Sequence, residues 1–300
     1  MPRTIWLASY PKSGNTWLRM LIANLSADSK PVDINGRLVR GPAACAREPF
    51  EQLTLLDTGL LTHDEIDCLR PRVYEELARD AVGEDEAPRD AAAVRFCLAH
   101  DAYELTPKGE PLLGGRDGAD GAILIVRDPR DVAPSLANHM RVGIDTAIKH
   151  INNERRMTHD RPGQQQRLFR QRPRGWSQHA RSWLEQRDIP VHMVRYEDLK
   201  ADTIGAFGRA LAFAGEPADA AVVRRAVAFS DFAELRGQEL RNGFSQSPQQ
   251  PGGPFFRRGE AGAWRDELSA EQVARVEKAH GPMMRRLGYG PEGALPLARA

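Results

Sequence analysis

The segment that most constrains this chain is residues 9–17, which read SYPKSGNTW. A short apolar run at residues 4–8 precedes it and is typical of a buried strand. After it, apolar residues recur at helical spacing from Trp17 to Leu25. The segment is therefore predicted to form the turn between a strand and a helix.

A turn of this kind favours an anion, because backbone N–H groups and the positive end of a helix dipole point at one place. Gly14 lets the backbone approach the ligand closely. Lys12 adds positive charge, and three neighbours offer hydrogen-bonding groups to oxyanion oxygens: Ser13, Asn15 and Thr16. In the nucleoside-triphosphate loop the lysine follows the second glycine, whereas here it precedes the glycine. The sequence predicts a phosphate loop of another kind.

A second phosphate site is indicated by residues 127–135, RDPRDVAPS, which follow the apolar run 122–126. Asp128 suits the N-cap of a helix and the proline after it suits the first turn. This places Arg127 at the strand end and Ser135 about two turns into the helix. A guanidinium fork and a hydroxyl can together hold a phosphate dianion.

Two more runs, residues 94–99 and 191–195, are predicted to be strands. We therefore expect a P-loop-like, three-layer α/β fold, with a central parallel sheet of about four or five strands flanked by helices. His100 and Tyr196 directly follow these strands. A histidine at the end of a parallel strand should face the crevice where open sheets bind ligands.

Composition excludes several classes of protein. The 300 residues carry a net charge of +1 with acids and bases mixed, so no global field favours nucleic acid or a membrane surface. No stretch approaches about 18 apolar residues, and we expect no membrane span. Cys45, Cys68 and Cys97 are widely spaced, which favours inert thiols and a cytoplasmic location.

Together these segments resemble the sulfotransferases that use 3′-phosphoadenosine 5′-phosphosulfate (PAPS). Residues 9–17 resemble their 5′-phosphosulfate loop and residues 127–135 their 3′-phosphate motif. Residues 256–264, FRRGEAGAW, resemble their third signature, RKGxxGDWK. Residues 175–183, GWSQHARSW, resemble a segment frequent in bacterial members. The resemblance spans nearly the whole chain.

The resemblance implies transfer of a sulfuryl group from PAPS to a hydroxyl or phenol of a small-molecule acceptor, with adenosine 3′,5′-bisphosphate (PAP) as product and no metal. His100 would be the general base, and Lys12 would stabilise the leaving oxygen. The implied donor contacts are Lys12, Ser13, Gly14, Asn15, Thr16 and Trp17 at the 5′-phosphate, Arg127, Ser135, Arg257, Arg258 and Gly259 at the 3′-phosphate, and Tyr196 near the adenine.

The chain departs from the family pattern in two places. Leu98 and Ala99 stand where the family often has Lys and Thr, so the help of that lysine is missing unless another group such as Arg95 supplies it. Ala263 replaces an Asp, which puts the anchoring of its loop in doubt.

Two alternatives are kept open. A P-loop kinase would need a Walker A order and a Mg²⁺-holding Asp after a strand. A non-catalytic nucleotide-binding module on the same fold would fit the missing Lys-Thr pair. If His100 is not the base, His139 and Glu197 are the next candidates.

We expect one sulfotransferase domain over residues 1–300, and a homodimer is compatible with the sequence. Residues 27–93 and 138–174 are interpreted as acceptor-side insertions. The Gln/Arg-rich run 164–174 is interpreted as solvated surface. Residues 241–256 are predicted to be a mobile loop over the cofactor. Its low-complexity part, residues 241–254, is expected to bury no core.

Overall fold

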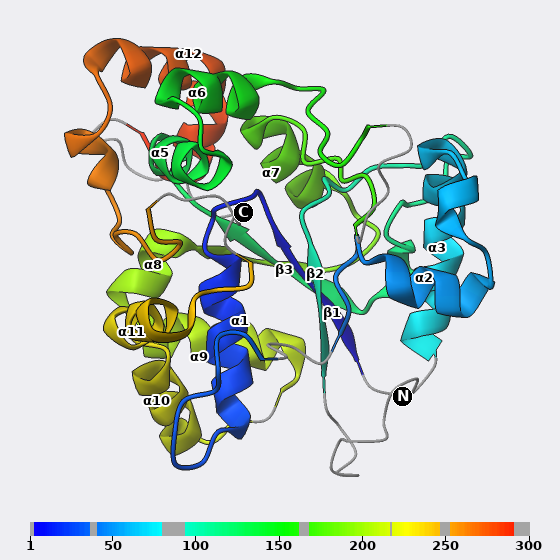
Figure 1. The fold of residues 1–300 in the computed structure, drawn as a ribbon, viewed down its shortest axis with the longest axis horizontal. Coiled ribbons are helices and arrows are strands. Elements are labelled where there is room, and N and C mark those ends of the chain that lie inside the picture. The colour runs from blue at the N-terminus through cyan, green and yellow to red at the C-terminus, as the bar shows by residue number, and fades with distance from the viewer. Residues whose placement is uncertain are drawn as a thin grey trace.

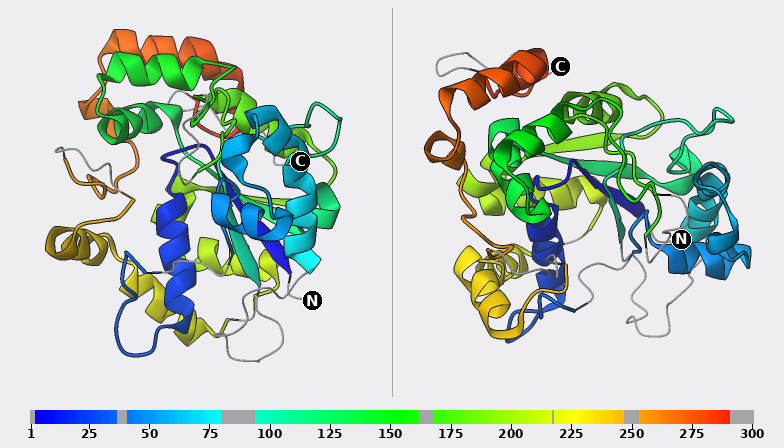
Figure 2. Two further views of the ribbon diagram at one scale, coloured as in Figure 1. Left: turned by 45° about the vertical axis from the view of Figure 1, so that its right-hand side comes forward. Right: turned by 45° about the horizontal axis from the view of Figure 1, so that its top comes forward.

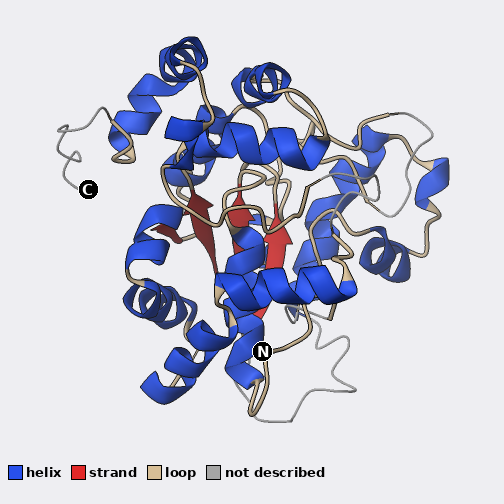
Figure 3. Cartoon of the chain, turned by 60° about the vertical axis from the view of Figure 1, so that its left-hand side comes forward, coloured by secondary structure: helices blue, strands red, loops and turns tan. Residues whose placement is uncertain are grey.

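The computed structural model describes residues 3–36, 41–79, 94–161, 168–216, 218–246 and 253–290. A four-stranded parallel sheet lies at the centre, in the order β2-β1-β3-β4, with helices on both faces (Figures 1 and 3). The strands are β1 (Thr4–Ser9), β2 (Arg95–Ala99), β3 (Gly121–Val126) and β4 (Val191–Arg195). The predicted α/β fold is confirmed.

Each face of the sheet buries its own set of helices. One face packs against α1 (Asn15–Ala23), α9 (Thr203–Ala214) and α10 (Ala220–Phe229). The other packs against α2 (Arg47–Thr54), α3 (His63–Arg79), α5 (Pro129–Met140), α6 (Ile144–Asn152), α7 (Trp176–Glu185) and α12 (Ala270–Arg286). Figure 2 shows α12 beside α6 at one end of the molecule. The remaining helices are α4 (Gly115–Gly118), α8 (Tyr196–Ala201) and α11 (Phe232–Asn242).

The alternation of side chains along β1 explains why it reads as an uninterrupted apolar run. Ile5 and Leu7 belong to the core on the α1 face, whereas Trp6 and Ala8 belong to the core on the α7 face. Both faces are covered, so every position of the strand is buried.

The strand order creates a crevice at the carboxyl edge of the sheet. The chain leaves β1 toward β2 on one side, and leaves β3 toward β4 on the other. Ligands of open parallel sheets bind where the direction of the connections reverses, which here is between β1 and β3. The two predicted phosphate segments follow these two strands. Asp128 caps α5 as predicted, since its side chain accepts from the Arg130 N–H.

The interpretation of residues 164–174 as solvated surface is wrong for the described part, residues 168–174. Arg172 is only 8% exposed, and its guanidinium lies 2.6 Å from a carboxylate oxygen of Asp67 in α3. Arg70 bridges the same carboxylate at 3.1 Å and Asp101 at 2.8 Å. Asp101 also accepts from the Arg172 backbone N–H. The acidic partners lie far away in sequence, so the local pattern could not reveal them.

The prediction that residues 241–254 bury no core is wrong for Phe244. Phe244 and Phe256 are each 7% exposed and pack against each other at 5.4 Å between ring centroids. Aromatic rings bury a large area per residue, which lets a polar segment contribute to a core. Residues 247–252 lie outside the described residues, and the prediction that residues 241–256 are mobile falls partly on them.

No helix within the described ranges is long and apolar enough to cross a membrane.

The buried ion network leads to a stability prediction. Asp101→Asn leaves the fully buried Arg70 with a weaker counter-charge, and we expect a loss of about 3–5 kcal/mol in the free energy of unfolding. The control is Asp64→Asn, because the Asp64 side chain is 71% exposed and its pair with Arg170 should contribute about 1 kcal/mol or less. Urea denaturation measures both. Equal losses would contradict the role assigned to the network.

Candidate active site

One cavity of about 740 Å³ gathers the predicted site residues at the carboxyl edge of the sheet. They come from the β1–α1 loop, the end of β2, the β3–α5 junction, the start of α8 and the segment before α12. Those that line the cavity are Lys12, Gly14, Asn15, Thr16, Trp17, His100, Arg127, Ser135, Tyr196, Arg257, Arg258 and Gly259. Ser13 is the exception, since its side chain is fully buried beneath the loop.

The β1–α1 loop has the geometry of an anion site. Ser13 N–H donates to the Tyr10 carbonyl, and the Leu18 N–H makes the helical bond to the Gly14 carbonyl, each at 3.2 Å. The backbone N–H groups before Leu18 therefore lack helical acceptors, as at any helix start. Gly14 has φ 106°, and a Cβ there would lie 2.6 Å from the Tyr196 ring. Only glycine fits this position without displacing the tyrosine.

The Asn15 side chain holds the loop onto β1. Its Nδ2 donates to the Leu7 carbonyl at 2.9 Å and to Ser9 Oγ at 3.1 Å. This amide points under the loop, so Asn15 offers an anion its backbone N–H rather than its side chain. Thr16, the next residue of α1, also lines the cavity.

Lys12 lies against an aromatic wall. Its Nζ is 3.6 Å from the centroid of the Phe255 ring, a cation–π contact. Desolvation, and then the positive charge of Arg127, lower the pKa of Lys12 to about 7. The lysine is therefore poised between its charged and neutral forms at neutral pH, and a bound anion would favour the charged form.

His100 has the tautomer that a general base requires. Its Nδ1 lies 2.8 Å from the Ser9 carbonyl oxygen, which can only accept, so Nδ1 carries the hydrogen and Nε2 is unprotonated. Desolvation lowers the pKa of His100 to about 4, which keeps the ring neutral at pH 7. Asp101, locked in the ion network, fixes the backbone next to it, and the Asp101 carbonyl accepts from Trp183 Nε1 at 3.0 Å.

The three arginines predicted for the 3′-phosphate lie on the same side of the cavity. Arg127 packs over the Tyr196 ring at 4.3 Å, and its Nε is buried with no hydrogen-bond partner among the described residues. Arg257 pairs with Glu267, and its Nη2 lies 2.8 Å from Glu267 Oε1. Arg258 Nη2 lies 3.0 Å from Asp266 Oδ2. If a phosphate bound here, its oxygens would replace these carboxylates as partners of the arginines.

Asp131 anchors the loop around Ala263, whose anchoring was in doubt because Ala263 replaces an aspartate. Its two carboxylate oxygens accept from the Gly262 N–H at 2.7 Å and the Trp264 N–H at 2.9 Å. A carboxylate from α5 thus binds the backbone on both sides of Ala263.

The two reserve candidates for the base differ. His139 lines the cavity, where burial and the charge of Lys12 lower its pKa to about 4. The Glu197 oxygens are engaged elsewhere, since they accept from the Asp128 N–H at 3.1 Å and from the Tyr289 hydroxyl at 2.7 Å. Glu197 thus connects Tyr289, which follows α12, to Asp128 at the start of α5.

Sequence reasoning missed two buried arginines that line the cavity. Arg19 is 7% exposed and donates to Gln246 at 2.7 Å and Thr16 Oγ1 at 3.3 Å. Its spacing of three from Thr16 places both on one helix face, and this signal was available. Arg156 is 5% exposed and lies in a polar segment after α6 that carries no local signal.

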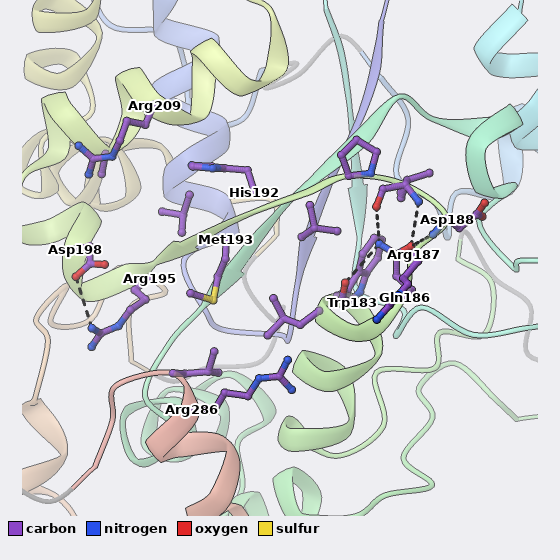
Figure 4. A pocket seen from close by; sticks show the side chains of 17 residues that line it. Trp183, Gln186, Arg187, Asp188, His192, Met193, Arg195, Asp198, Arg209 and Arg286 are labelled. Atoms are coloured by element: carbon purple, nitrogen blue, oxygen red, sulfur yellow. Dashed lines mark hydrogen bonds and ion pairs between the residues drawn. The ribbon is translucent and has the colours of Figure 1, made fainter. Parts of the chain in front are cut away.

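A second cavity, of about 840 Å³, runs along β4, the edge strand (Figure 4). Arg195 and Asp198 pair at one end, 3.8 Å apart, and Asp188 lies at the other. None of the predicted donor or catalytic residues lines it, so we assign the chemistry to the first cavity. Among the described residues, no cluster of three or more His, Cys, Asp or Glu side chains is arranged to hold a metal.

Fold and cavity define an α/β protein with a glycine-containing loop and several cations gathered at the carboxyl edge of a parallel sheet. A family model described as a sulfotransferase domain matches residues 2–288. The chain therefore belongs to the sulfotransferase family and is an enzyme of the PAPS-dependent type. This membership decides against the kinase alternative.

Individual relatives are distant but cover most of the chain. Flavonol 3-sulfotransferase of Flaveria bidentis is 23% identical over 289 residues, which is 92% of this chain and 80% of that protein. Sulfotransferase 2A6 of Rattus norvegicus is 24% identical, covering 97% and 86%. The crystal structure of mouse sulfotransferase SULT7A1 complexed with PAP has a similar fold, with a TM-score of 0.57, 19% identity, and coverage of 94% and 85%.

The lowered pKa of Lys12 leads to a linkage prediction. Bound phosphates raise this pKa from about 7, so wild-type protein near pH 8 should take up a proton when it binds PAP, and affinity should fall as pH rises through 7. Calorimetry in two buffers of different ionisation enthalpy measures the uptake. Lys12→Met should remove it, and His100→Ala should retain it. Identical heats for wild type in both buffers would show that Lys12 is not the linked group.

Proposed function

We propose that this enzyme transfers a sulfuryl group from PAPS to a hydroxyl or phenol of a small molecule, with His100 as base and Lys12 at the leaving oxygen. One observation carries the proposal. The Ser9 carbonyl accepts a hydrogen bond from His100 Nδ1–H, and His100 Nε2 is therefore unprotonated. The His100 side chain lines the same cavity as Lys12 and the β1–α1 loop.

The residues of the cavity suit the donor. Unpaired N–H groups at the start of α1, together with Thr16, would hold the 5′-phosphate, and the unpartnered Nε of Arg127 supports a phosphate beside it. Ser135, Arg257, Arg258 and Gly259 complete the 3′-phosphate site, with Tyr196 near the adenine. PAPS, when bound, supplies an activated sulfuryl group.

The protein's part in the reaction follows from this arrangement. His100 Nε2 accepts the proton of the acceptor hydroxyl as the hydroxyl oxygen forms its bond to sulfur. Lys12 stabilises the negative charge that develops on the oxygen whose bond to sulfur breaks. His139 is the alternative base. We propose that the reaction needs no metal and takes place in the cytoplasm.

We propose that Arg19 supplies the positive charge that the lysine of the missing Lys-Thr pair would have supplied. Arg95 does not suit this task, because it begins β2, at the opposite end of the strand from His100, and donates to the Leu77 carbonyl. Arg19 lines the cavity beside Thr16, and its Nε is buried with no partner among the described residues. Its guanidinium can donate to sulfuryl or phosphate oxygens.

The two predicted insertions support an acceptor end of the cavity, opposite the arginines of the 3′-phosphate site. The first insertion contributes Ala43 and Cys45, and the second contributes His139, Met140, Arg156, Thr158, His159, Leu168 and Gln171.

The base assignment is tested with His100→Ala. We expect kcat for a neutral phenol to fall by roughly 10² or more, while PAP affinity changes little. The defect should shrink for acceptors that are already ionised at the assay pH. Lys12→Ala should be slow with every acceptor, because it removes stabilisation of the leaving group. Wild-type turnover of a neutral phenol by His100→Ala, with chemistry limiting, would move the role of base to His139.

The 3′-phosphate assignment is tested by comparing PAP with AMP. Loss of two charge-assisted contacts should weaken binding of AMP by about 3 kcal/mol or more. Arg257→Gln and Arg258→Gln should each narrow the difference, whereas Lys278→Gln, an exposed cation of α12, should not. Equal affinity of the wild-type protein for PAP and AMP, measured by calorimetry, would remove the assignment.

A further inference from the structure

One bridge in the wall of the acceptor end extends the sheet beyond β2, and two more join segments of the wall to one another. Isolated bridges join Ala43 to Leu98, and Thr158 to Gln171. A third bridge joins Ala46 to Leu168. These segments bring apolar side chains to the cavity on the β2 side, next to His100. An acceptor with an apolar body would lie here with its hydroxyl at His100 Nε2.

Arg156 is held rigidly in this wall. Its backbone N–H donates to the Asn153 carbonyl, and its carbonyl accepts from the Arg174 N–H, both at 3.1 Å. The guanidinium donates to the Tyr10 hydroxyl at 2.8 Å and contacts Met140 Sδ at 3.6 Å. A phenol and a thioether are its side-chain partners, and neither carries a negative charge at neutral pH.

The lack of a counter-ion sets Arg156 apart from Arg70 and Arg172. Within the described ranges no carboxylate lies within ion-pair distance of Arg156, although the side chain is 5% exposed. Arg70 and Arg172, buried to a similar degree, each pair with Asp67. An unpaired buried charge is strongly unfavourable, and a bound anion would relieve this cost.

The acceptor end offers no carboxylate of its own. Among the described residues, the acids that line the cavity are Asp131 and Glu267. Asp131 binds the N–H groups of the Gly262–Trp264 turn, and Glu267 binds Arg257. Both lie with the donor-binding residues. Arg156 therefore shares this end of the cavity with imidazoles and apolar side chains. Its positive charge is available to pair with a bound ligand.

We propose that the acceptor is an anion, a hydroxylated carboxylic acid whose carboxylate binds Arg156 while its hydroxyl lies at His100. The inference rests on the proposed function for the hydroxyl and on Arg156 alone for the charge. A guanidinium has five N–H donors, and Tyr10 and Met140 engage two of its nitrogens through one contact each, so donors remain for a carboxylate.

Matched acceptors test the charge without turnover. Calorimetry on the PAP-loaded enzyme would compare a panel of hydroxyaryl carboxylic acids, such as 4-hydroxyphenylacetate, with their methyl esters. We expect an acid to bind about tenfold or more tightly than its ester, on the scale of a charge-assisted hydrogen bond. If no acid in the panel binds better than its ester, the proposal is overturned, and this comparison needs only wild-type protein.

Variants locate the effect at Arg156. Arg156→Gln should weaken binding of the acid by roughly 10–100-fold and of the ester by less than about threefold, and Arg156→Lys should restore part of the preference. The matched control is Arg155→Gln, an exposed neighbour that should change neither ligand. Unchanged PAP affinity in each variant verifies the fold. Equal losses for acid and ester would assign Arg156 a structural role and overturn the proposal.

Addition of PAPS separates the two hypotheses. Sulfation of neutral phenols and esters as fast as acids, with no effect of Arg156→Gln, would retain the proposed function and overturn the anionic acceptor. Binding of acids that depends on Arg156, with no sulfation of any hydroxyl, would support the anion site and overturn the proposed function.

Discussion

The hydrogen bond from His100 Nδ1 to the Ser9 carbonyl, 2.8 Å long, joins the ends of two neighbouring parallel strands, and the geometry of this end of the cavity depends on it. It selects the tautomer whose Nε2 can accept a proton, and it holds that nitrogen beside the anion loop. Nothing flexible separates the two groups, because β1 ends at Ser9 and the loop begins there. The ion network around Asp101 fixes the other strand end.

Charge is distributed in two ways in this molecule. Buried arginines that hold segments together, such as Arg70 and Arg172, are paired with Asp67 or Asp101. Two other buried cations, Arg156 and Arg19, line the cavity and make no ion pair with any described residue. The same desolvation that lowers the pKa of Lys12 makes the cavity receptive to anions, because a bound negative charge relieves the cost of several cations at once.

Sequence reasoning succeeded where local pattern and chemistry coincide. Apolar runs in sequence order predicted all four strands, and the change from a strand pattern to a helical pattern predicted the turn between β1 and α1. It failed for residues 168–174 and for Phe244, where burial depends on partners from distant segments. It also did not reveal that the Asn15 side-chain amide holds the loop onto β1. A motif names the residues of a site but does not say which way each side chain points.

The sequence alone determined the family, the order of the strands along the chain and the residues of the loop, because these depend on local backbone preference and on motifs. The tertiary structure decided which strand lies beside which, and therefore that His100 meets Ser9. It also decided that Asp131 replaces the missing anchor beside Ala263, and that Arg156 enters the cavity without a counter-ion. Pairing between distant charges is a property of packing, since burial and the absence of a partner exist only once the chain has folded.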